Sequence, residues 1–285
     1  MKLILIDFSW LYNKYYYVAT YKVGLNEEST DPEEALFNML YQFLRLVEKT
    51  QAPCKVILAL DSATSTLKNF QLFEGYKQNR NKEEKKAVYA PLKGIAKRLR
   101  NILNSKVFFF MRKKFYEADQ LLAYMVKKYH DKYEVIIYSG DKDLLQLTSY
   151  PNTFVADKFE KGKFLIKTDK EIFEKFKNNK GEDFSRISTN KRDILKYRSL
   201  KGDSSDNLCP VFPRIKDTEI AEIIKNHWVD DQEEPLTEEK INKIIEDDLQ
   251  FENPSLAEKL RNSKDVWLRN YKIMDLLHVN MDMGD

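Results

Sequence analysis

Acidic side chains recur at the ends of short apolar segments in this sequence. Asp7 and Asp61 each follow such a segment, and Asp141 and Asp143 of a GDKD motif follow a third. One aspartate in this position often caps the turn or helix that comes next. Capping alone is a weaker explanation for three separate instances, and we interpret these four residues as candidate metal ligands.

Two further motifs place pairs of acids close together. Glu117 and Asp119 open a predicted helix, where negative charge also stabilises the helix N-terminus without any catalytic role. Asp203 and Asp206 lie in GDSSD, a pattern that is also typical of a polar turn before a helix. Both motifs therefore keep a structural explanation beside the interpretation as metal ligands.

Clustered carboxylates repel one another, and divalent cations are the simplest way to stabilise them in ionised form. An all-oxygen ligand set favours Mg²⁺ or Mn²⁺, whereas zinc prefers histidine and cysteine, which are scarce here and show no paired ligand spacing. Two such ions about 4 Å apart can activate water for attack on a phosphodiester. The sequence lacks a GxSxG motif and a Walker A motif, so neither a serine hydrolase nor an NTPase is indicated.

The apolar segments have the length and continuity of strands that are buried on both faces of a parallel sheet. We predict strands at residues 2–6, 56–60, 107–111 and 135–138. Helical patterns lie between them, including a helix capped by Asp31 with Pro32 in its first turn and another over residues 117–130. Alternating strands and helices predict an α/β domain whose active edge is formed by the carboxyl ends of the strands.

The second half of the sequence differs, because strand patterns fade after about residue 184. Helices are predicted at residues 192–200, 217–226, 238–248 and 255–260. We therefore divide the chain into a sheet domain at residues 1–184 and a helical region at residues 185–285. The segment at about residues 62–105 is too long for an ordinary connection, and we predict an insertion at the active edge with a helix at residues 91–103.

Charge is nearly balanced over the whole chain but unevenly distributed along it. The 48 Lys and Arg residues against 45 Asp and Glu residues give a net charge of +3, so a nucleic-acid surface must come from segregation of charge. Residues 77–100 are strongly basic, whereas much of the sequence after residue 230 is acidic. No segment resembles a membrane span or a secretory signal, and two cysteines outside any CxxC pair fit a reducing cytoplasm.

Six motifs, taken together and in this order, resemble the flap endonuclease and 5′-3′ exonuclease family. They are LILIDFS at residues 3–9, LALDS at 58–62, FEGYKQNR at 73–80, YEADQ at 116–120, YSGDKDLLQL at 138–147 and LKGDSSDN at 200–207. A further segment, WLRNYKIMDL at residues 267–276, is similar to the closing segment of the family. Small bacteriophage enzymes and the 5′-nuclease domain of bacterial DNA polymerase I are the members that the chain most resembles.

The resemblance implies a PIN-like α/β fold with a helical arch and a C-terminal helix-three-turn-helix region. It also implies that eight acids hold two Mg²⁺ or Mn²⁺ ions: Asp7, Asp61, Glu117, Asp119, Asp141, Asp143, Asp203 and Asp206. Lys77 and Arg80 match arch positions that act on the scissile phosphate, where a cation offsets charge in the transition state. Both residues also fit a solvated basic helix face.

Further residues are predicted to contact DNA. They are Tyr76, Lys82, Lys85, Lys86, Arg214 and Lys216. The basic side chains would bind phosphates without reading the base sequence. Tyr76 could stack on an unpaired terminal base, although its neighbours Phe70 and Phe73 make a place in the core equally reasonable.

Two positions depart from the family pattern. The usual EADD motif is EADQ here, so the neutral amide of Gln120 replaces one carboxylate and offers only its carbonyl oxygen to an ion or a water. The glycine-rich PGVPGIG hairpin is replaced by residues 208–216, which contain no glycine. Glycine lets backbone groups approach a phosphate and a bridging monovalent ion, so we do not expect a potassium site in this hairpin.

These features predict a structure-specific 5′-nuclease with 5′-3′ exonuclease and flap endonuclease activity in replication or repair. The expected substrates are DNA with 5′ flaps, nicks or ends, together with RNA–DNA hybrids, and the products carry 5′-phosphates. Phosphate contacts would select such substrates by shape. We expect a monomer with a replication protein as partner, in the cytoplasm of a bacterial host if the chain is phage-encoded.

Three alternatives remain open at the level of sequence. A PIN-type endoribonuclease would share the sheet and the acids, but it has less need of GDSSDN and of a long basic arch. A phosphatase or phosphotransfer receiver would use Asp7 as a covalent site. A DNA-binding module without catalysis would result if Gln120 and the altered hairpin had weakened the chemistry, although the retained acids argue against it.

Overall fold

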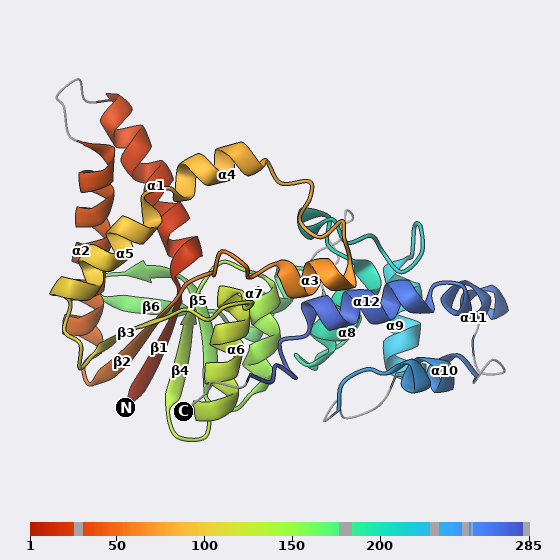
Figure 1. The fold of residues 1–285 in the computed structure, drawn as a ribbon. Coiled ribbons are helices and arrows are strands. Elements are labelled where there is room, and N and C mark those ends of the chain that lie inside the picture. Colours follow the sequence, from red (N-terminus) through yellow and green to blue (C-terminus); the bar gives the residue numbers. More distant parts are fainter. Residues whose placement is uncertain (26–30, 177–183, 229–233, 247–250, 252, 282–285) are drawn as a thin grey trace. The chain divides into compact units, whose positions relative to one another are not determined.

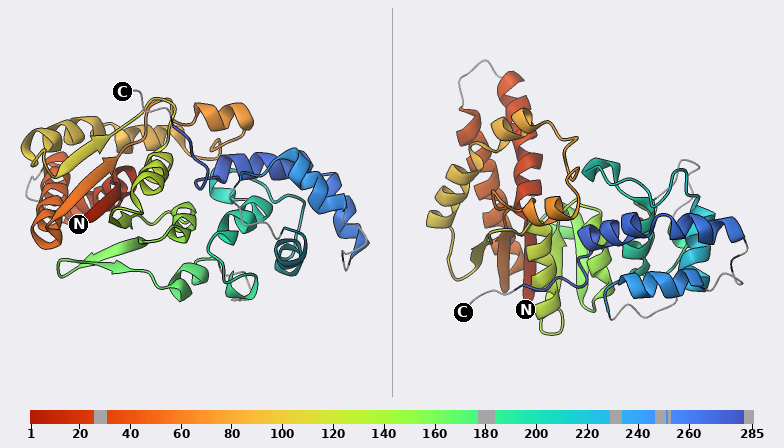
Figure 2. Two further views of the ribbon diagram at one scale, coloured as in Figure 1. Left: turned by 90° about the horizontal axis from the view of Figure 1, so that it is seen from below. Right: turned by 45° about the vertical axis from the view of Figure 1, so that its right-hand side comes forward.

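The computed structural model describes residues 1–25, 31–176, 184–228, 234–246, 251 and 253–281, and only the backbone of residues 21–25, Lys82 and Lys85. The chain forms two compact units (Figure 1, Figure 2). Unit 1 comprises residues 1–65, 80–144 and 150–166. Unit 2 comprises residues 66–79, 145–149 and 167–285. Each unit is therefore built from segments that are distant in the sequence.

A six-stranded sheet in the order β3-β2-β1-β4-β5-β6 organises unit 1 (Figure 1). The strands are β1 (Lys2–Asp7), β2 (Cys54–Ala59), β3 (Phe108–Met111), β4 (Glu134–Tyr138), β5 (Thr153–Glu160) and β6 (Lys163–Ile166). The first five run parallel, whereas β6 pairs antiparallel with β5. The four predicted strands and the mostly parallel α/β sheet are confirmed, but β5 and β6 were not predicted.

Helices cover both faces of this sheet (Figure 1, Figure 2). The helices of unit 1 are α1 (Phe8–Leu25), α2 (Pro32–Gln51), α4 (Lys82–Tyr89), α5 (Leu92–Ile102) and α6 (Ala118–Tyr129). Ile4 and Ile6 of β1 belong to a buried core that they share with α1, α2 and α5. The alternate residues Leu3 and Leu5 are buried on the opposite face, where α6 contacts β1, β2 and β4. Burial on both faces explains why the strands are almost continuously apolar.

Local signals account for where some of these helices begin. Asp31 accepts a hydrogen bond from the N–H of Glu33 at 3.0 Å, and Pro32 occupies the first turn of α2, as predicted. In contrast, α1 was not predicted, because its apolar residues lie on all sides and leave no helical periodicity in the sequence. None of the described helices is long and apolar enough to cross a membrane.

Unit 2 is helical. Its helices are α3 (Leu67–Leu72), α7 (Asp169–Glu174), α8 (Asp193–Lys201), α9 (Asp217–Glu222), the π-helical turn η4 (Ile223–His227), α10 (Glu238–Glu246), α11 (Pro254–Arg261) and α12 (Lys264–Met274). The core includes Trp267 of α12, whose ring meets Trp228 edge to face at 5.2 Å between centroids. The predicted helices are present, and the last two residues of the one expected at 238–248 lie outside the described residues.

The two units are divided at other places than the boundary expected at residue 184, because residues 66–79, 145–149 and 167–184 also belong to unit 2. The helices α3 and α7 belong to unit 2, although both precede residue 184. The physical reason for α3 is its packing against α12, a contact between segments about two thirds of the chain apart that no local pattern reveals. Of the segment expected as an arch, residues 62–65 and 80–105 belong to unit 1 and residues 66–79 belong to unit 2.

Candidate metal centre and nucleic-acid interface

Six of the predicted metal ligands belong to unit 1. They are Asp7, Asp61, Glu117, Asp119, Asp141 and Asp143. Strands β1, β2 and β4 are parallel neighbours in register, so the residues that follow them reach the same edge of the sheet. Glu117 and Asp119 lie at the start of α6, next to Ala118, whose N–H donates to Asp61 in the loop that follows β2. The structure therefore gathers all six carboxylates at the carboxyl edge of the sheet.

Asp7 is held by hydrogen bonds to both of its carboxylate oxygens. The backbone N–H of Trp10 donates to Oδ1 at 3.0 Å, and the Ser139 hydroxyl donates to Oδ2 at 3.0 Å. The same Ser139 oxygen accepts the N–H of Asp141 at 3.1 Å. One hydroxyl thus fixes the carboxylate of Asp7 and the backbone of Asp141 relative to each other.

The electrostatic environment of Asp7 disfavours its charged form. Burial, together with the charges of Asp61 and Asp141, raises the pKa of Asp7 to about 7, against the opposing effect of its hydrogen bonds. A divalent cation at this edge would offset the same repulsion and restore the ionised carboxylate. The burial and repulsion that raise the pKa of Asp7 therefore fit a site for a divalent cation.

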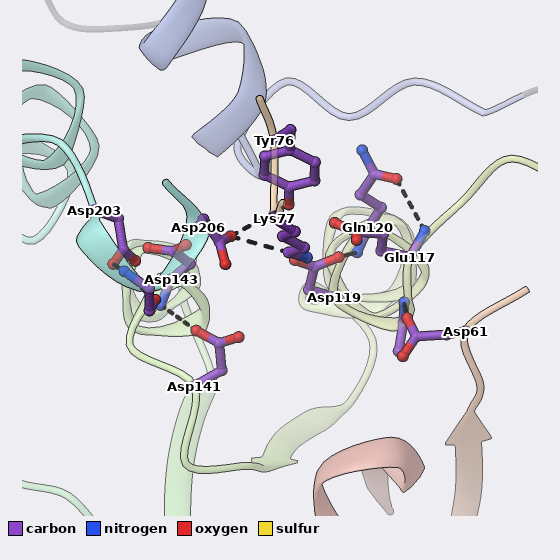
Figure 3. A network of polar contacts seen from close by, with 12 residues as sticks. Asp61, Tyr76, Lys77, Glu117, Asp119, Gln120, Asp141, Asp143, Asp203 and Asp206 are labelled. Carbon is purple, nitrogen blue, oxygen red and sulfur yellow. Dashed lines mark hydrogen bonds and ion pairs between the residues drawn. The ribbon is translucent and has the colours of Figure 1, made fainter. Parts of the chain in front are cut away.

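The start of α6 is joined to the loop that follows β2. Asp61 accepts the N–H of Ala118 at 2.8 Å through Oδ1 (Figure 3). The amide oxygen of Gln120 accepts the N–H of Glu117 at 3.1 Å, so Gln120 caps the start of its own helix. Asp119 accepts the N–H of Gln120 at 2.6 Å. These bonds orient the first turn of α6 beside Asp61.

The donor chemistry of unit 1 fits Mg²⁺ or Mn²⁺, because every candidate ligand is a carboxylate. Among the residues that the structure describes, however, no group of three or more His, Cys, Asp or Glu side chains is close enough to hold an ion as it stands. Several carboxylate oxygens instead accept backbone N–H groups, as in Asp61 and Asp141, which accepts the N–H of Asp143 at 2.8 Å. Metal binding would require these side chains to move.

Asp203 and Asp206 belong to unit 2 and have basic partners. Asp203 pairs with the guanidinium of Arg198 and accepts the N–H and hydroxyl of Ser205 at 2.8 and 2.7 Å. Burial alone would raise the pKa of Asp203, but Arg198 and the Ser205 hydrogen bonds outweigh it, and the pKa lies below its ordinary value. The charge of Asp203 is therefore compensated within the protein.

Asp206 fixes a segment of unit 2 that carries Lys77, one of the predicted catalytic residues. The Tyr76 hydroxyl donates to Asp206 Oδ2 at 3.2 Å, and the Lys77 ammonium lies 3.8 Å from the same oxygen (Figure 3). The Lys77 N–H also donates to the Asp206 carbonyl at 3.0 Å. Only 5% of Tyr76 is exposed, so its stacking on a base stays a prediction that requires the ring to become accessible.

The remaining predicted contacts to DNA are distributed over both units. Lys86 is exposed on α4, while the side chains of Lys82 and Lys85 lie outside the described residues. In unit 2, Arg214 and Lys216 are exposed before α9. Arg80 is partly exposed in unit 1, close enough to Tyr89 to act on its hydroxyl electrostatically. Their contacts with nucleic acid stay predictions.

Sequence reasoning missed two residues that position the candidate ligands. Ser139 appears in the sequence only as a small polar residue between the strand and the GDKD motif, a weak signal for a link between Asp7 and Asp141. Arg198 lies five residues before Asp203, and its basic character gave no indication of the pair that it forms.

Comparisons with known proteins show the family of the chain and its fold. Residues 2–177 match the protein family described as "5′-3′ exonuclease, N-terminal resolvase-like domain". The 5′-3′ exonuclease of Mycoplasmopsis pulmonis is 30% identical over 207 residues, which are 73% of this chain and 61% of that protein. The chain spans between 54% and 66% of the length of three such curated relatives.

Solved structures share the fold. A T5 protein co-crystallized with metal ions superposes with a TM-score of 0.67 at 17% identity, covering 97% of this chain and 90% of that one. A bacteriophage T5 flap endonuclease in complex with DNA and metal ions gives a TM-score of 0.61 at the same identity and coverage. Since the family description covers more than half of the sequence, from β1 to the end of α7, the chain belongs to the 5′-3′ exonuclease family.

Proposed function

We propose that the protein hydrolyses phosphodiester bonds in DNA with 5′ flaps, nicks or free 5′ ends, and that it depends on divalent cations. The observation that carries this proposal is the set of six carboxylates at one edge of the sheet in a member of the 5′-3′ exonuclease family. The T5 structures with DNA and with metal ions support the choice of substrate and cofactor. We infer Mg²⁺ or Mn²⁺ because all of the proposed ligands are oxygens, and two ions because a pair of ions can activate water for attack on a phosphodiester.

When bound, these ions would polarise the attacking water and neutralise charge on the phosphate. The protein supplies the remaining parts of the reaction. Ser139 holds Asp7 and Asp141 in place, and the N–H of Ala118 holds Asp61. Asp203 and Asp206 are proposed as further ligands of the same ions. Asp206 would give up the hydrogen bond that it accepts from the Tyr76 hydroxyl when it binds an ion.

Basic side chains would position the substrate. Lys77 and Arg80 are proposed to offset charge on the scissile phosphate, and the lysines of α4 and the pair Arg214 and Lys216 to bind phosphates elsewhere. Such contacts recognise the shape of a junction and not its base sequence. We also propose that RNA–DNA hybrids are substrates. The protein is proposed to act as a monomer in the cytoplasm, with a replication protein as its partner.

Cleavage mapping tests this function directly. Labelled 5′-flap, nicked, gapped and RNA-primed duplexes are incubated with Mg²⁺, and the expected result is a cut near the junction that leaves a 5′-phosphate. EDTA should abolish the reaction, and so should Asp143→Asn, whereas Asp131→Asn, an exposed acid on the α6–β4 turn, should not. Intact substrate that stays bound in Mg²⁺ and in Mn²⁺ would instead identify a DNA-binding module.

Two other outcomes would support different functions. Preferential cutting of RNA hairpins over 5′-flap DNA would indicate a PIN-type endoribonuclease, which shares the acids. A phosphoenzyme trapped on Asp7 would indicate phosphoryl transfer. The second outcome conflicts with the burial of Asp7, because 8% of this residue is exposed and both of its oxygens already accept hydrogen bonds.

A further inference from the structure

A short basic and aromatic turn separates β3 from α6 in unit 1. Residues 112–116 read Arg-Lys-Lys-Phe-Tyr, and none of the roles proposed above uses them. Arg112, Lys114 and Phe115 are exposed. The turn follows a strand of the active edge and leads directly into Glu117. A charged and aromatic surface therefore lies next to a candidate metal ligand.

The turn holds Phe115 in an unusual backbone conformation. The Tyr116 N–H donates to the Lys113 carbonyl at 3.3 Å, which closes a four-residue turn. Phe115, the third residue of this turn, has φ of +69°, a value that favours glycine and is rare for a bulky side chain. A large ring at a position suited to glycine suggests that the ring itself serves a purpose.

A second contact ties this turn to the loop that follows β2. The Phe115 N–H donates to the Thr64 hydroxyl at 3.3 Å. Thr64 lies three residues after Asp61, and Asp61 accepts the N–H of Ala118 at 2.8 Å. The loop that follows β2 therefore accepts one hydrogen bond from within residues 112–116 and a second from Ala118, two residues after this turn.

The exposed side chains match the chemistry of a nucleotide. Phe115 is 37% exposed, and the Lys114 ammonium lies 4.8 Å from the centre of its ring. The Lys113 ammonium lies 5.8 Å from the ring of Tyr116. An aromatic face stacks on any base, and adjacent cations bind the phosphates on either side of that base.

We propose that residues 112–116 bind an unpaired nucleotide of the substrate, with its base stacked on Phe115 and its phosphates beside Arg112 and Lys114. This inference rests on the proposed function, because the bound nucleotide would belong to the DNA strand that reaches the candidate metal ligands. A fully paired end exposes only the outer face of its last base pair, and any other base would have to unpair and unstack before it could pack on Phe115. The site therefore distinguishes unpaired nucleotides from duplex DNA.

The chain offers a matched control for this surface. Phe109 of β3 is 43% exposed, and the Lys55 ammonium lies 5.3 Å from the centre of its ring. The pair repeats the aromatic and cationic chemistry of Phe115 and Lys114. It lies within β3, however, and not in the turn whose Phe115 N–H donates to Thr64.

Binding is measured by fluorescence anisotropy in EDTA with three DNA hairpins that share one duplex and end blunt, in a 5′ overhang or in a 3′ overhang. Phe115→Gly removes the ring at a position where glycine is favoured, and Phe115→Trp keeps an aromatic face. We expect Phe115→Gly to weaken binding of at least one overhang hairpin by about 5- to 20-fold, and Phe115→Trp to retain it. The blunt hairpin should bind both variants alike, and Phe109→Thr should bind all three hairpins as the wild-type protein does.

A second measurement tests the phosphates. Arg112→Gln combined with Lys114→Gln should reduce the slope of log Kd against log salt by roughly 1.4 for the overhang hairpin, since each phosphate contact to a single strand contributes about 0.7. An unchanged slope overturns the phosphate contacts. Unchanged overhang binding by Phe115→Gly, or an equal loss on the blunt hairpin, overturns the inference as a whole.

The assay separates this inference from the proposed function, because EDTA prevents cleavage and only binding is measured. If the wild-type protein cuts no substrate, and Phe115→Gly still weakens overhang binding, the proposed nuclease function is refuted and the nucleotide site is retained. A protein that cuts flaps and binds overhangs equally well with and without the ring would refute the nucleotide site alone. Thermal melting followed by circular dichroism confirms that Phe115→Gly is folded.

Discussion

The carboxylate of Asp7 in unit 1 is buried beside other acids, whereas the carboxylate of Asp203 in unit 2 is paired with a guanidinium. Burial and the charges of Asp61 and Asp141 raise the pKa of Asp7 to about 7. For Asp203, burial acts in the same direction, but Arg198 and the hydrogen bonds from Ser205 together outweigh it and lower the pKa. The charge of Asp203 in unit 2 is thus balanced by a guanidinium of the protein, whereas the charge of Asp7 in unit 1 is opposed by burial and by neighbouring acids.

The largest expected effect follows from removing a charge where no internal cation replaces it. Asp141→Asn should lower the rate of flap cleavage by more than about 100-fold, because it weakens the electrostatic stabilisation of the transition state. Asp203→Asn should cost less, roughly 10-fold, since Arg198 already compensates that charge. The measurement is single-turnover cleavage in Mg²⁺. Equal losses in the two variants would remove the distinction between the two units.

The next effect concerns stability in unit 2. Arg198→Met leaves the largely buried carboxylate of Asp203 without its partner, and we expect the free energy of unfolding to fall by about 3 kcal/mol. Urea denaturation of the metal-free protein measures this change. Adding Asp203→Asn to the first substitution should restore part of the loss. A double variant as unstable as Arg198→Met alone would show that Arg198 stabilises the unit by packing and not through this pair.

In unit 1, removing a charge should increase stability. Asp7→Asn should raise the free energy of unfolding by on the order of 2 kcal/mol at pH 8 in EDTA, because the neutral side chain avoids the cost of a buried charge. The folded protein binds a proton at Asp7 more tightly than the unfolded chain, whose pKa is near the ordinary 3.8. The stabilising contribution of this protonation is complete below about pH 4 and is lost as the pH rises through about 7.

The advantage of Asp7→Asn should therefore be absent near pH 4, grow with pH and level off above about pH 7. Urea denaturation at a series of pH values in EDTA follows this curve. The exposed Asp131→Asn is the control and should leave the free energy of unfolding unchanged at each pH. A variant that is less stable than the wild-type protein at pH 8 would contradict the electrostatic account of Asp7.

The smallest expected effect tests the contact of Asp206. Tyr76→Phe removes one hydroxyl that donates to Asp206 and should lower the free energy of unfolding by about 1 kcal/mol. Lys77 remains beside the same carboxylate, which limits the loss. Tyr17→Phe, at an exposed tyrosine of α1, is the matched control. An effect of several kcal/mol would mean that Tyr76 organises more of unit 2 than this single hydrogen bond.

Much of the active edge could be predicted from the sequence, because parallel strands deliver the residues at their carboxyl ends to one place. Asp7, Asp61 and Asp141 were identified in this way, and the sheet confirms the strand ends on which the argument depended. The hydrogen bond from Ser139 to Asp7 joins residues 132 positions apart. No local pattern encodes such a contact, because it depends on the order of the strands in the sheet.

Other features escaped prediction for different reasons. The π-helical turn η4 and the unexpected helix α1 lack the periodicity on which sequence interpretation relies. The backbone of Phe115 was not foreseeable either, since a positive φ is expected of glycine and not of phenylalanine. Sequence reasoning thus predicted which acids follow neighbouring strands of the sheet, but not the residues that hold these acids in place.

The path of the chain between the two units has a consequence for how the protein folds and how it can be divided. The chain changes unit after residues 65, 79, 144, 149 and 166. No single cut therefore releases either unit, and a fragment that ends at residue 166 would keep α3 without the helix α12 against which it packs. Unfolding of one unit also removes the anchors of segments that return to the other. Such interleaved connections favour cooperative unfolding over the independent melting of two domains on a simple tether.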